Sequence, residues 1–333
     1  MKYVGLDVHK ETVHGTVMDE HGRVLKRKGF FNTPKGYEEF FKGIGDAEVA
    51  MEATYGWQPP YELLERMGYK VKLAHPYETR IIAKSKIKTD AKDSEKLAQL
   101  LRTGFLPEAY VPPNHVRELR ELLYRHTYLV RTRTKFKNKI KAALAKRWID
   151  TPHDPSTKKG KLALRQLGIS ELEDYVGVID ALEERIKKLE KQVEFLAGEN
   201  ADAKLLMTIP GVGYFSALAI LAEIGDIYRF DSSEELCSYA GIVPSTRESG
   251  GIVRRGGITK QGRKLMRWVL DLCVLVHLKY ETKLTSYWKH IAKIRGKKAA
   301  TTATARKMLK VMYWMLKRKE VYRPEGVRPG KYR

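Results

Sequence analysis

The first 110 residues alternate between short apolar runs and amphipathic segments. Three apolar runs separated by turns come first, and helical and apolar segments then alternate. The expected strands are residues 2–8, 11–22, 23–33, 47–54 and 69–76. Helices are expected after Thr33 and Pro34, with Asn32 or Thr33 as cap and an end near Gly43, and at residues 61–67 and 92–102. Three meander strands followed by alternating helices and strands predict a mixed α/β, ribonuclease-H-like fold.

Beyond residue 113 the pattern changes to long helices. Residues 115–148 carry apolar residues at helical spacing between many Arg and Lys residues, and residues 151–161 are rich in turn formers and predict a loop. The following helix has apolar residues in alternating steps of three and four: Ile179, Leu182, Ile186, Leu189, Val193 and Leu196. This spacing is typical of a coiled coil, which either packs within one chain or joins two chains.

The last third of the chain is again mostly helical. Residues 208–213, TIPGVG, lie between two apolar helices. Such a turn is either a helix-hairpin-helix motif that aims backbone N–H groups at a phosphate or an ordinary helical turn. We therefore predict three segments: an α/β domain at 1–110, long coiled-coil-like helices at 111–202, which contact nucleic acid or another subunit, and a mainly α domain at 203–333.

The net charge of the chain narrows the range of possible partners. The chain carries a formal net charge of +23 and has an isoelectric point near 9.8. So many uncompensated cations favour a nucleic acid partner over a merely soluble basic surface, although charge does not separate DNA from RNA. Because no charged leader or long apolar run is present, we expect a cytoplasmic protein without membrane contacts. Cys237 and Cys273 lack the spacing of a zinc site and are expected to be buried.

Two acidic residues stand in otherwise apolar strands. Asp7 lies within residues 4–8, and Glu52 follows the apolar residues of the fourth expected strand. A carboxylate in such a run is costly unless it binds a cation or hydrogen-bond donors. An acid in a first strand also begins the sugar-kinase and actin-like ATPase domains, but their glycine-rich phosphate loops are missing here.

Asp90 and Asp93 are three residues apart in the last helix of this domain and therefore share one face. Four carboxylates from three elements could hold two Mg²⁺ ions, with Mn²⁺ as the alternative, for phosphodiester chemistry. Asp90 and Asp93 could instead be ordinary acids at a helix N-terminus, paired with Lys86, Lys88 or Lys92.

A second candidate centre lies in the polar, glycine-rich segment 239–263. Ser249 precedes two glycines and is a candidate nucleophile, with Ser245 as the competitor and an ordinary solvated loop as the plain alternative. A flexible basic loop would suit a phosphate backbone. The cations expected to contact nucleic acid are Arg247, Arg254, Arg255, Lys260 and Arg263 here, and Arg131, Arg133 and Lys137 in the long helix.

These motifs resemble one family in order along nearly the whole chain. GLDVHK around Asp7, MEATYGW around Glu52, KTDAKDSEKLAQLL around Asp90 and Asp93, TIPGVG, and YAGIVPSTRESGG followed by GGITKQGRKLMR are similar to the DEDD insertion-sequence transposases of the IS110 family. Each motif is weakly specific alone, and their order and separation are specific together.

The resemblance implies a recombinase that excises and inserts its own mobile element. It implies a RuvC-like N-terminal domain whose four acids hold Mg²⁺, and a C-terminal transposase domain in which Ser249 forms a covalent link to DNA. It further implies a structured guide RNA, element and target DNA, a dimer or tetramer, and a prokaryotic, nucleoid-associated location. RNA guidance would explain the excess charge and the lack of an evident base-reading helix.

Two other classes of protein remain on residue types alone. A junction-resolving nuclease would use only the four acids and water, so that Ser249→Ala would still cut. A non-catalytic nucleic-acid-binding protein would keep binding after Asp7→Asn.

Overall fold

The computed structural model describes residues 1–54, 56–82, 89–150, 153–249 and 252–324. It divides into two compact units, residues 1–111 and residues 112–333. The further boundary expected near residue 202 stays a prediction. In the part of the chain described, no helix combines the length and apolar character needed to cross a membrane.

The first unit is built on a five-stranded mixed sheet in the order β3-β2-β1-β4-β5. Its strands are β1 (Lys2–Val8), β2 (Thr12–Met18), β3 (Val24–Phe31), β4 (Ala47–Glu52) and β5 (Lys70–Ala74). β1 is antiparallel to β2 and parallel to β4, and β5 is parallel to β4. The predicted meander and the two later strands are confirmed, and the topology is compatible with a ribonuclease-H-like sheet.

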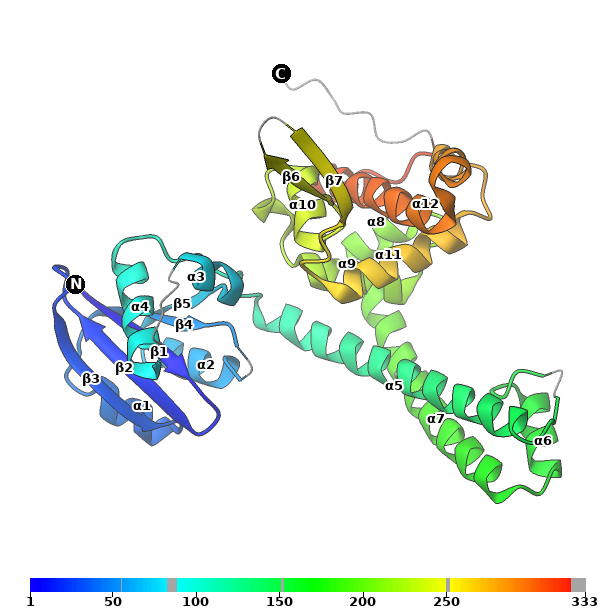
Figure 1. The fold of residues 1–333 in the computed structure, drawn as a ribbon, viewed down its shortest axis with the longest axis horizontal. Coiled ribbons are helices and arrows are strands. Elements are labelled where there is room, and N and C mark those ends of the chain that lie inside the picture. The colour runs from blue at the N-terminus through cyan, green and yellow to red at the C-terminus, as the bar shows by residue number, and fades with distance from the viewer. Residues whose placement is uncertain (55, 83–88, 151–152, 250–251, 325–333) are drawn as a thin grey trace. The chain divides into compact units, whose positions relative to one another are not determined.

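Helices cover both faces of this sheet (Figure 1). They are α1 (Pro34–Phe41), α2 (Gln58–Arg66), α3 (Pro76–Ile82) and α4 (Asp90–Arg102). Tyr37 and Phe40 of α1 and Leu64 of α2 share one apolar cluster with the strand residues Leu6 and Met51. On the other face, α4 packs through a second cluster: Ala50, Ala74, Leu97, Leu100, Leu101 and Leu106.

Gly5 is the reason that α4 lies so close to the sheet. A Cβ atom on Gly5 would lie 2.0 Å from the Ser94 carbonyl oxygen and 2.4 Å from the Ala98 nitrogen. On the opposite face a Cβ on Gly15 would lie 2.3 Å from the Phe40 ring. The two glycines therefore allow helices to pack tightly against neighbouring strands.

The second unit begins with a pair of long helices. Its elements are α5 (Asn114–Ala145), α6 (Lys158–Gln166), α7 (Ser170–Glu199), α8 (Ala201–Met207), α9 (Tyr214–Ile224), the short helix η1 (Ile227–Arg229), α10 (Ser233–Ala240), β6 (Pro244–Ser249), β7 (Ile252–Ile258), α11 (Lys264–His277) and α12 (Lys283–Arg318). The predicted loop at 151–161 is partly wrong, because α6 already begins at Lys158, where the Thr157 hydroxyl caps the helix by accepting from the Gly160 nitrogen.

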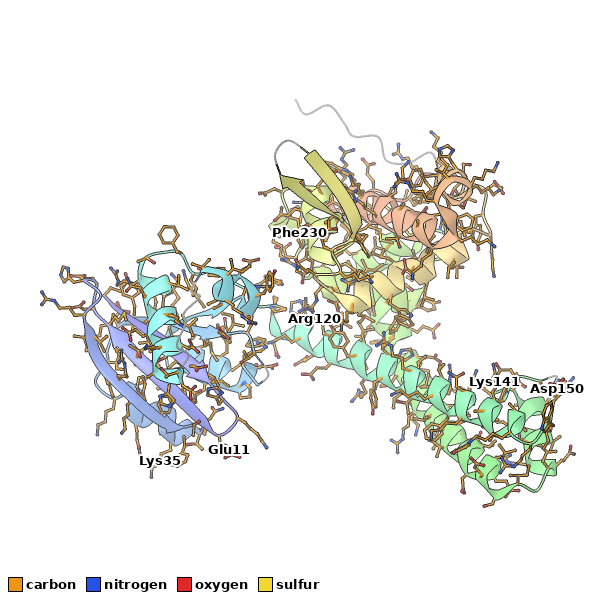
Figure 2. The ribbon with its side chains drawn as sticks, viewed as in Figure 1. Glu11, Lys35, Arg120, Lys141, Asp150 and Phe230 are labelled. Atoms are coloured by element: carbon orange, nitrogen blue, oxygen red, sulfur yellow. The ribbon has the colours of Figure 1, made fainter. Side chains whose placement is uncertain are left out.

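The predicted coiled-coil spacing packs within the chain. Ile179 of α7 lies in one apolar cluster with Ile140 and Leu144 of α5, and Val193 joins the main core of the unit. That core also holds Phe230, whose ring lies 5.3 Å from the Tyr239 ring, whereas charged side chains such as Lys141 are exposed along α5 (Figure 2). Part of the apolar stripe of α7 that predicted a coiled coil is therefore buried within one chain.

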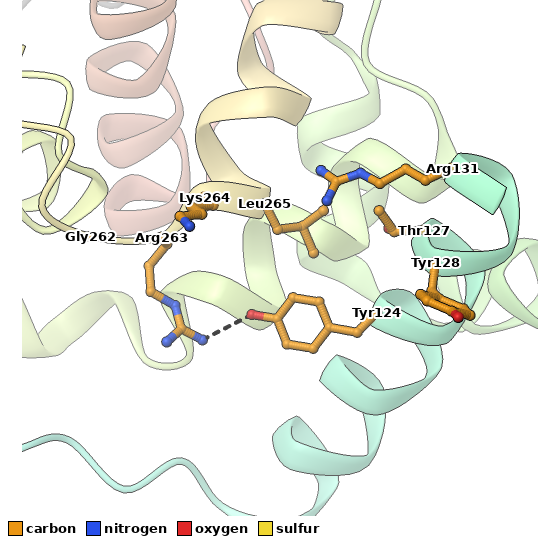
Figure 3. Close-up of a pocket in the computed structure, with 8 residues that line it drawn as sticks. All are labelled: Tyr124, Thr127, Tyr128, Arg131, Gly262, Arg263, Lys264 and Leu265. Carbon is orange, nitrogen blue, oxygen red and sulfur yellow. Dashed lines mark hydrogen bonds between the residues drawn. The ribbon is translucent and has the colours of Figure 1, made fainter. Parts of the chain in front are cut away.

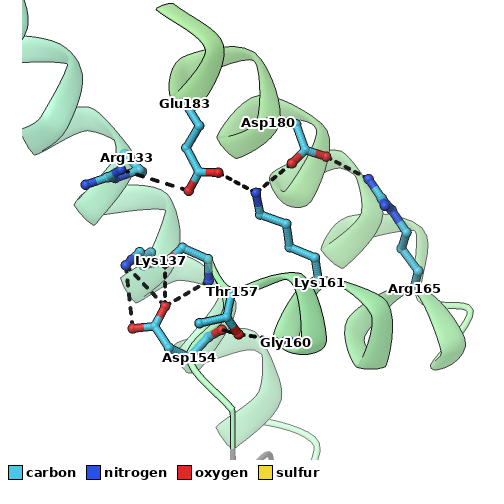
Figure 4. A network of polar contacts seen from close by, with 10 residues as sticks. Arg133, Lys137, Asp154, Thr157, Gly160, Lys161, Arg165, Asp180 and Glu183 are labelled. Carbon is cyan, nitrogen blue, oxygen red and sulfur yellow. Dashed lines mark hydrogen bonds and ion pairs between the residues drawn. The ribbon is translucent and has the colours of Figure 1, made fainter. Parts of the chain in front are cut away.

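The far end of the α5–α7 pair is tied together by ion pairs (Figure 4). The Lys161 ammonium of α6 lies 2.7 Å from Asp180 and 2.5 Å from Glu183, both on α7. Lys137 of α5 contacts Asp154 at 3.1 Å. Because these side chains come from three helices and the connection between them, the network fixes how the helices meet.

Candidate metal centre and nucleic-acid contacts

Asp7 and Glu52 lie at neighbouring strand ends on the face that α4 covers. Leu6 pairs with Met51 in the parallel register of β1 and β4, so Asp7 and Glu52 each follow the last pair. Side chains alternate between the faces of a sheet, so Asp7 shares its face with Gly5, and Glu52 shares its face with Ala50. Gly5 and Ala50 both lie against α4. The register therefore brings the two in-strand acids to the same end of two neighbouring strands.

Asp90 and Asp93 occupy the first turn of α4. Thr89 caps this helix, since its hydroxyl accepts a hydrogen bond from the Lys92 nitrogen at 3.3 Å. Asp93 pairs with Lys96 at 2.6 Å, a helix-surface partner that is not one of the three lysines expected for this role. Of the expected partners, Lys86 and Lys88 lie outside the described residues.

Asp7, His9 and Asp90 converge on one point. Each offers a ligand atom, and these atoms all lie within 4.8 Å of one another. The His9 Nε2 atom is 3.3 Å from Asp7 Oδ2 and 3.6 Å from Asp90 Oδ2. His14, which pairs with Asp7 in the β1–β2 register, places its Nε2 atom 3.9 Å from Asp90 Oδ2. Two histidines thus join the predicted acids.

The electrostatics of this cluster favour a bound cation. Burial raises the pKa of the Asp7 carboxyl, whose side chain is only 17% exposed, and repulsion from Asp90 and Asp93 adds to the rise, while His9 opposes it. A divalent cation between the carboxylates would remove this repulsion. Carboxylate oxygens and an imidazole nitrogen are ligands that Mg²⁺ and Mn²⁺ accept, so the residues present fit such an ion.

Sequence reasoning missed His9 and His14. A weak signal exists, since His9 follows Asp7 by two residues in GLDVHK and His14 alternates with Thr16, whose hydroxyl bonds to Ser94 of α4 at 2.8 Å. Of the four predicted acids, the structure groups Asp7 with Asp90. Asp93 is close enough to repel the Asp7 carboxylate, and Glu52 ends the neighbouring strand β4.

The glycine-rich segment around Ser249 is a β-hairpin in its described part. Ser249 pairs with Ile252, and Arg247 pairs with Arg254, in the antiparallel register of β6 and β7. The expectation of a flexible loop is wrong for the residues on either side of Gly250-Gly251, because these residues form an antiparallel ladder. The side chains of Ser249, Arg247, Arg254 and Arg255 lie outside the described residues.

Ser245, the competing serine, packs against the facing strand. A Cβ atom on Gly256 would lie 2.5 Å from the Ser245 hydroxyl oxygen, so the glycine makes room for this hydroxyl. The contact gives Ser245 a packing role within the hairpin.

The other cations that were expected to contact nucleic acid differ in whether an acidic side chain pairs with them. Lys260 is exposed at the end of the hairpin segment. Arg263 pairs with the fully buried Glu223, Arg133 lies 3.9 Å from Glu183, and Lys137 contacts Asp154. Arg131 lies over the Trp268 ring at 5.3 Å. Their contacts with nucleic acid stay predictions, and those of Arg263, Arg133 and Lys137 would compete with acidic partners.

The turn at residues 208–213 has an internal packing role. Gly211 has a φ of 92°, and a Cβ there would lie 2.8 Å from the Cys273 carbonyl oxygen. The His277 ring bonds to the Pro210 carbonyl oxygen at 2.7 Å. The turn therefore seats α11, and a phosphate contact stays a prediction. Cys237 and Cys273 are buried thiols, as expected.

Comparison with known proteins assigns the chain to a family. A DEDD transposase model of IS110 elements matches residues 4–149, and a model described as transposase of the IS116/IS110/IS902 family matches residues 203–289. The chain is 27% identical to the transposase of insertion sequence IS1111A from Coxiella burnetii, over 97% of this chain and 92% of that protein. It is also 27% identical to the transposase of IS1328 from Yersinia enterocolitica, over 86% and 87%, and 25% identical to a probable family 20 transposase from Pseudomonas aeruginosa, over 96% and 98%.

An acidic cluster on a mixed sheet, in a strongly basic chain, together with these matches defines a transposase, an enzyme that cleaves and rejoins DNA. The chain belongs to the DEDD transposases of the IS110 family. The two models span the acidic cluster and the serine hairpin, so the predicted family is confirmed.

Proposed function

We propose that this transposase excises and inserts a mobile element through two chemical centres, a carboxylate metal centre in a RuvC-like first unit and a serine nucleophile in the second. The observation that carries the proposal is the convergence of Asp7, His9 and Asp90 near the C-terminal end of β1. Such convergence of a half-buried acid with a second acid is costly without a cation, so it is best explained by a functional site.

In this proposal Asp7, Glu52, Asp90 and Asp93 hold Mg²⁺, with Mn²⁺ as the alternative. The ions would supply positive charge to the phosphate oxygens during strand transfer. Asp7 anchors the site from the rigid sheet, and the capped first turn of α4 carries the two later acids. His9 contacts both Asp7 and Asp90 and would orient these carboxylates.

Ser249 is the proposed nucleophile. Its hydroxyl oxygen would bond to a phosphorus atom of DNA while the bond from that phosphorus to the leaving sugar oxygen breaks. The proton that the serine loses is balanced by the proton that the leaving oxygen gains, and the phosphodiester energy is conserved for rejoining. The packing of the Ser245 hydroxyl against Gly256 supports Ser249 over Ser245 as the reactive residue. Arg247 and Arg254, opposite each other in the ladder, would attract the scissile phosphate.

The proposed partners are the DNA of the element ends and of the target, a structured guide RNA, and further copies of the chain in a dimer or tetramer. The net charge of +23 supports a large polyanionic partner. A strand-transfer reaction joins several DNA ends, and an oligomer would let both centres act on them together.

The experiment is a cleavage and strand-exchange assay on element-end DNA, with the element's flanking noncoding RNA and Mg²⁺. Wild type should recombine, whereas EDTA, Asp7→Asn and Ser249→Ala should each abolish recombination. Cleavage that persists in Ser249→Ala but needs Asp7 would replace the proposal with a junction-resolving nuclease that uses water. Recombination by Asp7→Asn would refute the metal centre.

A matched control is available for each centre. Ser245→Ala removes a hydroxyl from the same strand and should leave strand exchange largely intact. Glu11→Gln changes an exposed acid that lies just after β1 and should also have little effect.

A further inference from the structure

A cavity of about 440 Å³ opens in the second unit between one face of α5 and the start of α11 (Figure 3). Its size falls in the range of small-ligand sites, which is roughly 300–1,000 Å³. It is lined by Tyr124, Thr127, Tyr128 and Arg131 of α5 and by Gly262, Arg263, Lys264 and Leu265. The α5 residues recur every three or four positions and so share one face of the helix.

Glu223 fixes one wall of this cavity. Its carboxylate is fully buried and accepts hydrogen bonds from the Tyr124 hydroxyl and the Arg263 guanidinium. Arg263 also donates to the Tyr124 oxygen at 3.3 Å. Burial and Glu223 keep the Tyr124 hydroxyl protonated, with the pKa of Tyr124 raised to about 12, so Tyr124 remains a donor at neutral pH.

Two cations at the cavity are left without an acidic partner. Glu223 neutralises Arg263, whereas neither Arg131 nor Lys264 lies within 4.0 Å of a carboxylate among the residues that the structure describes. The Arg131 guanidinium lies over the Trp268 ring and is thereby positioned. The cavity thus offers two uncompensated positive charges to an anion.

The cavity also presents aromatic surface to solvent. The Tyr128 side chain is 67% exposed and Tyr124 is 43% exposed. Exposed rings beside free cations are the combination that single-stranded nucleic acid sites use, because bases stack on the rings and phosphates meet the cations.

We propose that this cavity takes one unpaired nucleotide of a single strand, with its base against Tyr128 and its phosphate at Arg131 and Lys264. A base inside a duplex has both faces stacked and cannot enter a concave site without leaving the helix. The inference rests on the proposed function for its nucleic acid substrate, and it names where the second unit holds a strand.

Binding of fluorescent 20-nucleotide dT and U single strands and of a matched duplex to the full-length protein, measured by anisotropy in EDTA, tests the proposal. Cleavage is absent under these conditions, so failure of the catalytic proposal would leave this measurement unchanged. Tyr128→Ala should weaken single-strand binding roughly tenfold, because stacking on one aromatic side chain has an effect of that order. Duplex binding should change little, and Tyr128→Phe should restore single-strand affinity because it keeps the ring.

Arg131→Gln and Lys264→Gln should each lower the number of ions released on single-strand binding by about one. This number is measured from the slope of log affinity against log salt concentration. A preference for dT or for U tells whether the strand is DNA or RNA, and either preference supports the site. The controls are Tyr228→Ala, which removes another exposed ring, and Lys293→Gln, which removes another exposed cation.

The proposal is overturned if Tyr128→Ala leaves single-strand binding unchanged, weakens it no more than Tyr228→Ala, or weakens duplex binding equally. Thermal unfolding of each variant separates these results from misfolding, which is not expected for an exposed side chain.

Discussion

Asp7 places a carboxylate where burial and neighbouring acids disfavour its charge. Its carboxylate is mostly buried and lies near two further acids, so removal of its charge should help the fold when no cation is present. His9, which contacts Asp7 and Asp90, offsets only part of this repulsion. A destabilising residue held in place by rigid secondary structure is typical of functional sites.

Asp7→Asn should therefore unfold at the same or a higher temperature than wild type in EDTA. With Mg²⁺ at ten times its Kd, wild type should gain about 1.4 kcal/mol, while the variant should gain little. Differential scanning calorimetry with and without Mg²⁺ measures both effects. Equal stabilisation of the two proteins by Mg²⁺ would mean that Asp7 is not a ligand.

Several site residues could not be found from the sequence because their partners are distant along the chain. In the sequence, Glu223 lies in an apolar helical segment. Its partners Tyr124 and Arg263 lie 99 and 40 positions away along the chain, so no local pattern links them. Asp7 and Glu52 were found because a charge inside an apolar strand is visible locally. Tyr124 and Tyr128 carry no such local signal.

At the scale of elements, the sheet and α4 act together to assemble the acidic cluster. The meander, the Thr33 cap of α1 and most helix ends follow from periodicity and turn residues. α3 was missed because His75 and Pro76 look like the end of the preceding strand, although Pro is favoured in a first helical turn. The β6–β7 hairpin was missed although a Gly-Gly pair is favoured in two-residue hairpin turns, because the preceding residues 244–249 are mostly polar and lack a strand pattern.

Gly5→Ala tests the contact between the sheet and α4. The added methyl group would overlap the α4 backbone, so we expect a loss of about 1–3 kcal/mol in the free energy of unfolding. The shift of α4 should also weaken Mg²⁺ stabilisation, because Asp90 and Asp93 lie on that helix. Urea unfolding measures the first effect. Gly177→Ala is the control, since its Cβ meets open space within α7 and should be neutral or stabilising.

Asp154 gives the α5–α6 connection a defined pH dependence. Hydrogen bonds from the Ser156 hydroxyl and backbone N–H, with Lys137 adding to them, hold the pKa of Asp154 well below its usual value. A lowered carboxyl pKa contributes stability that is present above pH ~4 and is lost as the pH falls further.

Asp154→Asn should therefore be less stable than wild type at pH 7, and the difference should shrink as the pH falls below 4. The effect should stay below about 1 kcal/mol, because the Asp154 side chain is 48% exposed and solvent screens its contacts. Urea unfolding at pH 7, 5 and 3 measures it. A difference that grows toward pH 3 would contradict this assignment.

At the scale of the whole molecule, the chain carries a net charge of +23, and the two proposed chemical centres belong to different units. Ion pairs such as those of Lys161, Arg263 and Lys137 with acids contribute nothing to this sum, so the net charge counts only cations in excess of the acids. That excess favours a polyanionic partner. Family membership explains why such a chain carries both an acidic cluster and a basic, serine-bearing hairpin.

The most direct measurement locates the covalent bond between protein and DNA. The protein would react with element-end DNA, Mg²⁺ and the flanking noncoding RNA, and the product would be digested with nuclease and trypsin before mass spectrometry. Arg247 separates Ser245 from Ser249, and Arg254 follows, so trypsin places the two serines in different peptides. If Ser249 is the nucleophile, a nucleotide is found on the peptide 248–254, and it is absent after Asp7→Asn. DNA cleavage with no modified peptide, or with the nucleotide on the Ser245 peptide, would contradict this proposal.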